Sequence, residues 1–250
     1  MMRGYALLAV AALFCGAAER PEVNIAAAAN LGDVFRAAGP RFEAATGIHP
    51  VFSFGSTAQL TQQIEHSAPF DVFAAADASH VDQLQREGKL VAGTKAVYAT
   101  GVLALWIPPA SHAKIARIED LASPEVRVIA VARPELAPYG AATIETLRKL
   151  GIWGKVRPKI VYGDSISMAK QYGTSGNADA VFTAYSLVLK EGGKAMPVDE
   201  SLHQPIAQSL GVIAGAAHEK AAILFAEFLL RGKGREILSQ YGYRVAEARR

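Results

Sequence analysis

Four short segments combine small polar residues with the expected start of a helix, so that each supplies hydrogen-bond donors without supplying charge. They are 27–30 (AAAN), 54–57 (FGST), 136–140 (LAPYG) and 163–167 (GDSIS). In each, an apolar run typical of a strand ends and a run typical of a helix begins. A helix start leaves backbone N–H groups without intrahelical acceptors and carries roughly half a positive elementary charge. Four such starts around one cleft predict a binding site for a dianion.

Side chains at these segments add further neutral donors. Asn30, Ser56 and Thr57 carry amide or hydroxyl groups, and Gly55 and Gly140 are expected to let the backbone approach a ligand closely. The alternative is that each segment is an ordinary helix cap, which is the commoner role of Ser, Thr and Asn at such positions. Spacing alone does not decide whether the four segments converge.

Composition and motif content argue against an enzyme and against a nucleic-acid-binding protein. The 250 residues are 51% hydrophobic and 20% charged, as in globular domains, and the net charge of +3 includes no block of Lys and Arg. The six His residues have no metal-site spacing, and no G-x-S-x-G, P-loop or dinucleotide fingerprint is present. We therefore predict a binding protein with no cofactor and no catalytic residues.

The first 18 residues have the pattern of an export signal. Arg3 precedes the apolar run 5–14, and Gly16-Ala17-Ala18 forms a small-residue cleavage site. Cleavage after Ala18 would remove Cys15, the only cysteine of the chain, and bulky Phe14 in front of it disfavours a lipid anchor. The alternative is an apolar N-terminal strand. We expect a soluble, exported protein located in the periplasm.

Short apolar runs alternate with amphipathic runs, a pattern typical of βα units and of an α/β protein with mixed, mainly parallel sheets. Strands are predicted at 23–28, 51–54, 72–76, 102–107, 126–130, 160–162 and 180–183, and helices at 32–45, 58–66, 81–87, 141–150, 168–174, 219–230 and 234–241. Pro40 is expected to kink or split its helix.

The absence of a polar linker favours two lobes joined by extended crossovers near 98–101 and 203–208. We predict that residues 19–100 and 206–250 form one lobe and residues 101–205 the other.

Nine segments, in order along nearly the whole chain, resemble the periplasmic molybdate-binding proteins of ABC importers. They are 24–30, 42–48, 52–60, 63–77, 90–93, 136–140, 150–153, 163–166 and the C-terminal stretch up to 241–243. The resemblance implies the two-lobed fold of the type II periplasmic binding proteins. It also implies a ligand, molybdate or tungstate, held between the lobes by neutral side chains and backbone amides.

Carried over position by position, the resemblance implies five contact residues. They are Asn30, the pair Ser56 and Thr57 with the hydroxyl and amide of Thr57 as the closest match, the amide of Tyr139 and the amide of Ile166.

The sequence departs from the family at three of the relevant positions. Ala184 stands where many members place a tyrosine hydroxyl on the ligand, and Ala29 stands where some have a hydroxyl. Tyr139 is bulky where many members have a small residue, and we expect its ring to act only as a lid over the cleft. Tyr185 is expected to point elsewhere.

The partners implied by the resemblance are an ABC permease with a cytosolic ATPase, and we expect the receptor to be a monomer.

Molybdate and tungstate are fully deprotonated near neutral pH, so donors alone can satisfy them, whereas a protonated oxyanion needs an acceptor. The main alternative is a receptor for another tetrahedral oxyanion, such as sulfate or phosphate. Two further classes of protein are disfavoured. A ferric-ion receptor would have C-terminal tyrosine pairs, which are not evident in this sequence, and the sensing domain of a transcription regulator would lack the export signal.

Overall fold

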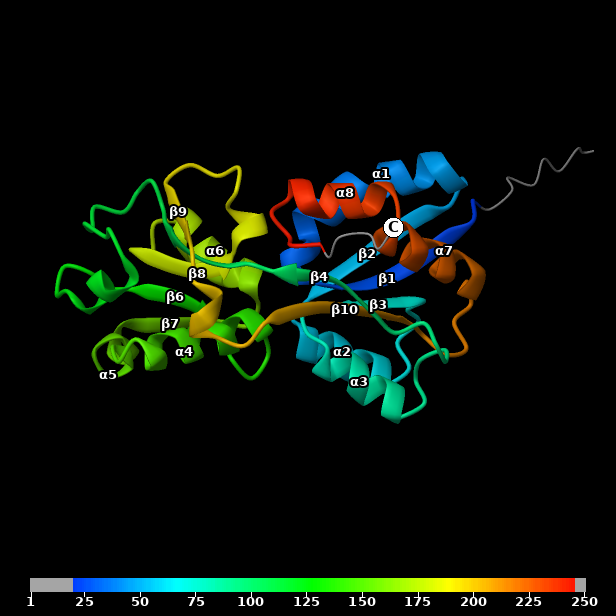
Figure 1. Cartoon of the computed structure of the whole chain (residues 1–250), viewed down its shortest axis with the longest axis horizontal. Coiled ribbons are helices and arrows are strands. Elements are labelled where there is room, and N and C mark those ends of the chain that lie inside the picture. The colour runs from blue at the N-terminus through cyan, green and yellow to red at the C-terminus, as the bar shows by residue number, and fades with distance from the viewer. Residues whose placement is uncertain (1–19, 246–250) are drawn as a thin grey trace, which may run out of the picture.

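Two five-stranded sheets, each covered by helices on both faces, make up the computed structural model, which describes residues 20–245 (Figure 1). The expected export signal at residues 1–18, with its cleavage site and Cys15, lies outside the described residues. We call the parts built on the two sheets lobe 1 and lobe 2.

Lobe 1 has the strand order β2-β1-β3-β10-β4. Its strands are β1 (Glu22–Ala28), β2 (His49–Gly55), β3 (Val72–Ala75), β4 (Ala96–Gly101) and β10 (Ile206–Val212), and its helices are α1 (Gly32–Thr46), α2 (Thr57–Glu65), α3 (Ser79–Arg86), α7 (Glu219–Leu230) and α8 (Lys233–Gln240). Strands β1, β2 and β3 run parallel, whereas β10 is antiparallel to both of its neighbours. Helices α1, α7 and α8 cover one face of this sheet, and α2 and α3 cover the other (Figure 1).

Lobe 2 repeats this arrangement with the strand order β7-β6-β8-β5-β9. Its strands are β5 (Leu103–Ile107), β6 (Ile129–Ala132), β7 (Ile160–Gly163), β8 (Ala180–Ala184) and β9 (Lys194–Pro197), and its helices are α4 (Pro138–Lys149), α5 (Trp153–Val156) and α6 (Ile166–Thr174). Strands β6, β7 and β8 run parallel, and β5 is antiparallel to β8 and β9. Short 3₁₀ turns complete the chain at Ala29–Leu31 (η1), Ile118–Ala122 (η2), Arg157–Lys159 (η3), Tyr185–Leu187 (η4) and Glu200–Leu202 (η5).

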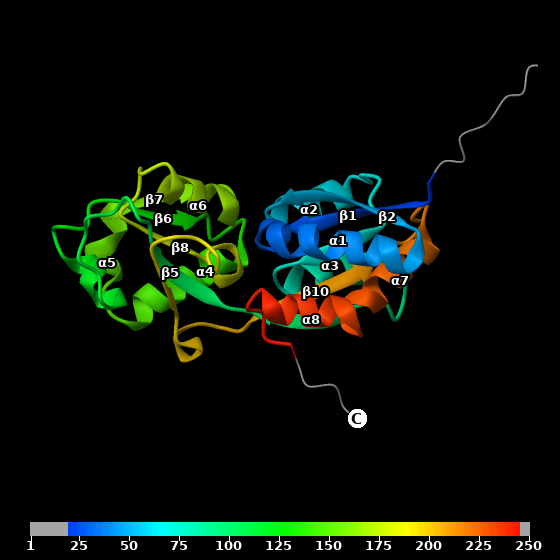
Figure 2. The ribbon, with the colours of Figure 1, turned by 90° about the horizontal axis from the view of Figure 1, so that it is seen from above.

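The chain passes between the lobes twice, from β4 into β5 and from β9 into β10 (Figure 2). In both sheets the strand that follows a crossover, β5 or β10, is the one that pairs antiparallel with its neighbours. The α/β class and the mixed sheets predicted from the sequence are confirmed. In α/β proteins, ligands bind beyond the carboxyl ends of the parallel strands. In both lobes these strand ends face the junction between the lobes (Figure 1).

Two local predictions from the sequence differ from the structure in part. Of the two effects expected of Pro40, the split does not occur, because helix α1 continues from Gly32 through Pro40 to Thr46. The proline removes one backbone donor, and the buried side of the helix, which includes Phe35 and Phe42, packs the helix onto the sheet regardless. The predicted strand 126–130 lies instead at Ile129–Ala132, because the residues before it form a turn after η2.

A cluster of aromatic rings attaches the C-terminal helices to lobe 1. The Phe225 ring lies at the centre of this cluster, with ring centroids 5.6 Å from Phe35, 5.2 Å from Phe42 and 6.0 Å from Phe52. Two of these contacts are edge-on, the geometry that aromatic quadrupoles favour. Phe225 of α7 therefore holds together α1, β2 and the returning end of the chain.

We predict that Phe225→Ala lowers the free energy of unfolding by about 3–5 kcal/mol, because it leaves a cavity where α1, β2 and α7 meet. Urea denaturation followed by circular dichroism measures the change. The adjacent Leu224 is 43% exposed, so Leu224→Ala is a matched control and is expected to stay within about 0.5 kcal/mol of the parent chain. An equal loss in both variants would contradict the central role of Phe225.

Candidate oxyanion site between the lobes

The four segments singled out in the sequence all follow the carboxyl end of a parallel strand. Strand β1 ends at Ala28 before Asn30, and β2 ends at Gly55 before Ser56 and Thr57. In lobe 2, β6 leads to the start of α4 and β7 leads to the start of α6. Each lobe thus contributes two segments to the edge at which the lobes meet.

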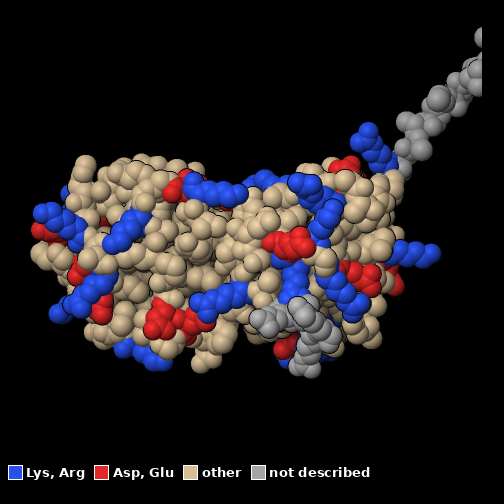
Figure 3. Space-filling view, turned by 45° about the horizontal axis from the view of Figure 1, so that its top comes forward, with Lys and Arg blue, Asp and Glu red and all other residues tan. Residues whose placement is uncertain are grey.

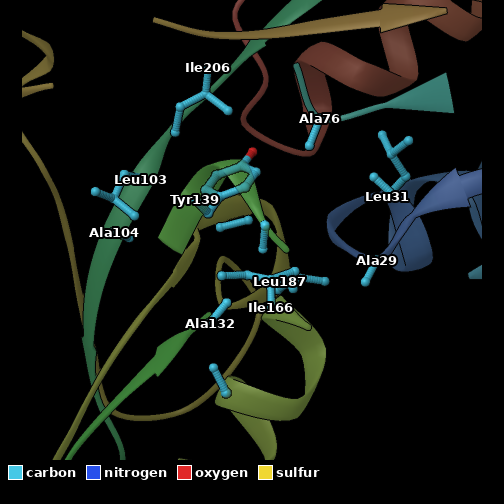
Figure 4. Packing of buried hydrophobic residues seen from close by; sticks show 14 of the residues in the cluster. Ala29, Leu31, Ala76, Leu103, Ala104, Ala132, Tyr139, Ile166, Leu187 and Ile206 are labelled. Atoms are coloured by element: carbon cyan, nitrogen blue, oxygen red, sulfur yellow. The ribbon is translucent and has the colours of Figure 1, made fainter. Parts of the chain in front are cut away.

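Hydrogen bonds across the junction bring these segments together in pairs. The Ala58 N–H, in the first turn of α2, donates to the Leu136 carbonyl, which precedes α4, over 3.2 Å. The Ser167 hydroxyl at the start of α6 donates to the Ala29 carbonyl over 3.3 Å. Figure 4 shows Ala29 and Leu31 of lobe 1 lying across from Ile166 and Leu187 of lobe 2. The structure therefore places all four segments around one inter-lobe position.

Three helix starts present N–H groups with no protein acceptor. Within residues 20–245, the amides of Thr57, Tyr139 and Ile166 donate no hydrogen bond to the protein, although these residues are only 1%, 1% and 4% exposed. Two other amides in the first turns of α4 and α6 are paired: the Gly140 N–H donates to the Ala137 carbonyl and the Met168 N–H to the Ser165 hydroxyl. Because buried N–H groups are almost always paired, these three are candidates to bind an acceptor-rich ligand.

The Ser56 hydroxyl adds a fourth unpaired group. Its Oγ is fully buried and has no hydrogen-bond partner among the described residues, and it does not cap α2 despite preceding it. Ser165, at the matching position before α6, does cap its helix. The Thr57 Oγ1 accepts from the Ala76 N–H at 3.2 Å, so its own proton is available to a ligand.

The Asn30 side chain faces the protein rather than an open site. Its amide group donates to the Gln208 Oε1 and to the Tyr243 hydroxyl, both over 2.8 Å. The Tyr243 hydroxyl in turn donates to the Asn30 carbonyl over 2.8 Å. Both side-chain protons of Asn30 are therefore used inside lobe 1, which leaves its backbone amide as the group that can donate to a ligand.

The Tyr139 ring is not a lid, contrary to the expectation from the sequence. It is 1% exposed and points from α4 toward the crossovers and Ile206 (Figure 4). A Cβ added at Gly101 would lie 2.1 Å from the Tyr139 hydroxyl, so this glycine provides the space for it. Ala184 is buried at the end of β8, and the Tyr185 ring that follows packs beside Gly242, away from the four segments.

Two glycines fix where the lobe 2 amides lie. A Cβ at Gly140 would lie 2.2 Å from the Ala132 carbonyl oxygen, and a Cβ at Gly163 would lie 2.7 Å from the Ala169 nitrogen. Because both obstacles are backbone atoms, α4 and α6 are pressed directly against the ends of β6 and β7. Gly140 thus serves helix–strand packing rather than close approach of a ligand. The same holds for Gly55, because the Leu60 side chain occupies the space beside it.

The donors that meet at this junction are neutral. The ion pair between Arg133 and Asp164, whose residues lie close to the lobe 2 segments in the sequence, is exposed. On the face shown in Figure 3, Lys and Arg side chains lie among Asp and Glu rather than in one field. Among residues 20–245, no group of three or more His, Cys, Asp or Glu side chains is arranged to hold a metal ion. In the same residues, no helix combines the length and apolarity needed to cross a bilayer.

Sequence reasoning missed the polar residues that surround Asn30. Gln208, Tyr243 and Ser186 are all buried, and they come from a crossover strand, the C-terminal segment and a short turn after β8. Gln208 carried a usable signal, because a glutamine inside the mostly apolar run of β10 needs buried partners. Its amide nitrogen donates to the Ala76 and Ile206 carbonyls. Tyr243 and Ser186 carried no comparable signal.

Two α/β lobes, two crossovers and buried donors where the lobes meet define a two-lobed solute-binding protein. The family model of bacterial extracellular solute-binding proteins matches residues 23–244, and the chain belongs to this family. It is therefore an extracytoplasmic solute receptor rather than an enzyme.

Individual relatives narrow the comparison. The chain is 38% identical to the molybdate-binding protein ModA of Rhodobacter capsulatus over 226 residues, which covers 89% of this chain and 88% of the relative. It is 36% identical to ModA of Azotobacter vinelandii over 241 residues, 93% of this chain and 94% of the relative. The solved periplasmic molybdate-binding protein of Azotobacter vinelandii superposes with a TM-score of 0.86 at 27% identity, covering 90% of this chain and all of that one.

We predict opposite effects on stability for the two neighbouring hydroxyl groups in anion-free buffer. Ser56→Ala removes a buried hydroxyl that has no partner and should leave the free energy of unfolding unchanged or slightly higher. Thr57→Ala leaves the buried Ala76 N–H unpaired and should lower it by about 1–3 kcal/mol. Urea unfolding of both variants tests this, and a larger loss for Ser56→Ala would show that its hydroxyl is paired in solution.

Alkaline pH should destabilise the protein through three buried tyrosines near the junction. Burial raises the pKa of Tyr98, Tyr139 and Tyr243 above the ordinary value, and neighbouring hydroxyls raise the first two further. Above a pH of about 10 the unfolded chain loses these protons while the folded protein keeps them, so the free energy of unfolding falls as pH rises. Each group contributes a slope of about 1.4 kcal/mol per pH unit there. Urea unfolding between pH 9 and 11 should show a shallower fall for Tyr243→Phe, and an unchanged slope would contradict this.

Proposed function

We propose that this protein binds molybdate, and tungstate equally well, in the inter-lobe site and delivers the anion to an ABC permease driven by a cytosolic ATPase. The observation that carries the proposal is a buried set of donors with no protein acceptor: the amides of Thr57, Tyr139 and Ile166 and the hydroxyl of Ser56. The identity of 36–38% to two molybdate-binding proteins supports the choice of ligand.

The chemistry of the donors favours a fully deprotonated tetrahedral anion. All four oxygens of molybdate accept hydrogen bonds, and every group proposed to meet them is an N–H or O–H donor. Hydrogen phosphate carries a proton that would lack an acceptor, at a cost of about 1–3 kcal/mol for a buried unpaired group. Sulfate has no such proton, so it must be discriminated by its smaller size. The backbone contacts at Gly140 and Gly163 support a cradle of fixed radius.

Five residues make up the proposed site: Asn30, Ser56, Thr57, Tyr139 and Ile166. We propose that Asn30 contributes its backbone amide, because both protons of its side chain donate to Gln208 and Tyr243. Thr57 contributes its hydroxyl and amide, Tyr139 and Ile166 contribute amides, and Ser56 contributes its hydroxyl. The Ser56 hydroxyl is a candidate substitute for the hydroxyl that Ala184 cannot supply.

We further propose a periplasmic monomer, freed of residues 1–18 and without a lipid anchor. Its lobes would span residues 19–100 with 206–250 and residues 101–205. The change from the first sheet to the second between Gly101 and Leu103, and the return between Pro197 and Ile206, support these limits. Because donors from both lobes reach one anion only when the lobes meet, the anion would favour the closed arrangement.

Isothermal titration calorimetry of the purified exported protein with molybdate, tungstate, sulfate and phosphate tests the function. We expect tight one-to-one binding of the first two and no measurable binding of the others. Ser56→Ala and Thr57→Ala should each weaken molybdate binding about 10- to 150-fold, the range for a hydrogen bond to a charged group. Asn30→Ala should also weaken it, by loosening the backbone at that position.

The matched control is Ser175→Ala, which removes an exposed hydroxyl bonded to the Tyr172 carbonyl at the far end of α6 and should leave binding unchanged. Tight binding of sulfate or phosphate would keep the fold and overturn the ligand. Unchanged molybdate affinity in both Ser56→Ala and Thr57→Ala would overturn the proposed site.

A further inference from the structure

Two buried hydroxyl groups outside the proposed site, those of Ser186 and Tyr243, join the lobes beside it in a bridge at the Asn30 carbonyl. The Ser186 hydroxyl of lobe 2 lies 3.2 Å from the Asn30 carbonyl and 3.2 Å from the Tyr243 hydroxyl, both in lobe 1. Ser186, Asn30 and Tyr243 are 8%, 1% and 4% exposed. Since the Tyr243 proton goes to the Asn30 carbonyl, Ser186 must donate its own proton to lobe 1 at one of these two oxygens.

Each end of the bridge is firmly attached to its own lobe. Tyr243 follows α8, and the next residue, Arg244, pairs with Thr100 of β4 through two backbone hydrogen bonds of 2.7 and 2.9 Å. Ser186 lies in η4, directly after β8, and is preceded by Tyr185, whose N–H donates to the Val102 carbonyl over 2.8 Å. Figures 1 and 2 show the end of α8 at the boundary between the lobes. A rotation of one lobe against the other therefore acts directly on the bonds made by Ser186.

We propose that Ser186 is a positioning residue that stabilises the closed arrangement of the lobes, so that it raises affinity for the anion without touching it. This inference rests on the function proposed above. The bridge ends on Asn30, whose backbone amide we assign to the site, and Tyr243 holds the same residue through both its side chain and its carbonyl. Closure of the lobes and placement of a ligand-binding amide are thereby coupled at one residue.

The expected consequence follows from the equilibrium between open and closed forms. When the anion binds first to one lobe and closure follows, a fall in the equilibrium constant for closure raises the apparent dissociation constant by the same factor. Loss of the bridge should act on dissociation, because the anion leaves after opening, and should leave the association rate unchanged. A contact with the anion itself would instead alter the preference among anions of different size.

The experiment compares Ser186→Ala with the parent chain in calorimetry and in stopped-flow tryptophan fluorescence with molybdate and tungstate. We expect both dissociation constants to rise by the same factor, about 2- to 13-fold for one neutral hydrogen bond, through faster dissociation. Tyr243→Phe should act in the same direction. The double variant should lose less than the product of the two single factors, because the two hydroxyl groups lie 3.2 Å apart and share the Asn30 carbonyl in one hydrogen-bond network.

Ser209→Ala is the matched control. The Ser209 hydroxyl is also buried and donates to a carbonyl, that of Ala207, over 3.3 Å, but this bond lies within lobe 1. Its affinity should equal that of the parent chain. An equal loss in Ser209→Ala, an unchanged affinity in Ser186→Ala or a changed ratio of molybdate to tungstate affinity would each overturn the proposal.

A measurement without ligand separates this proposal from the proposed function. Small-angle X-ray scattering of the anion-free proteins should give a larger radius of gyration for Ser186→Ala than for the parent chain and for Ser209→Ala. If the parent chain bound neither molybdate nor tungstate, the proposed function would be overturned. The comparison of the radii of gyration would still test whether Ser186 stabilises the closed arrangement. Equal radii in the three proteins would overturn this role of Ser186.

Discussion

Buried N–H groups without protein acceptors are the constraint on which the rest of this structure depends. Leaving such a group unpaired costs about 1–3 kcal/mol, and within residues 20–245 the amides of Thr57, Tyr139 and Ile166 and the Ser56 hydroxyl have no protein partner. Parallel strands bring them to one edge of each sheet, and the two crossovers set the edges opposite each other. In the proposed site, this local cost is maintained because the same donors would be satisfied by a bound anion.

The proposed discrimination among anions rests on neutral donors and a fixed backbone. A lysine or arginine would bind any anion within reach of a flexible side chain, whereas an amide at a helix start has one position. At α4 and α6 that position is determined by contact between backbone atoms, because Gly140 and Gly163 leave no room for a side chain against Ala132 and Ala169. The donors of the proposed site are backbone amides and the hydroxyls of Ser56 and Thr57, none of which titrates near neutrality, so we expect anion binding to be independent of the ionisation of the site there.

The sequence predicted the parts of this site that are local and missed the parts that depend on tertiary contact. Strand ends and helix starts follow from hydrophobic period and small polar residues, so the segments at Asn30, Ser56 and Ile166 could be identified in advance, and the α/β class and family followed. The side-chain direction of Tyr139 depends on the space left by Gly101, more than thirty residues earlier, and no local pattern carries that information. The same holds for Ser186, which meets Asn30 across 156 positions of the chain. Pro40 shows the reverse case: the local rule allows the helix to be split there, and the packing of its buried face keeps the helix continuous.

The balance between closure and binding can be argued from these groups. Three neutral hydrogen bonds join the lobes beside the site: Ala58 to Leu136, Ser167 to Ala29, and Ser186 to Asn30 or Tyr243. The charged contacts between the lobes, the ion pair of Arg244 with Glu200 and Lys190 over the Tyr241 ring, lie at the surface, where such pairs contribute little. Closure gains these bonds but removes water from the unpaired donors, so without an anion the two effects oppose each other. An anion changes only the second effect, because it satisfies the donors that closure would otherwise bury unpaired. A small set of weak inter-lobe bonds is therefore what keeps closure sensitive to the ligand, since a strong set would close the lobes whether or not the anion was present.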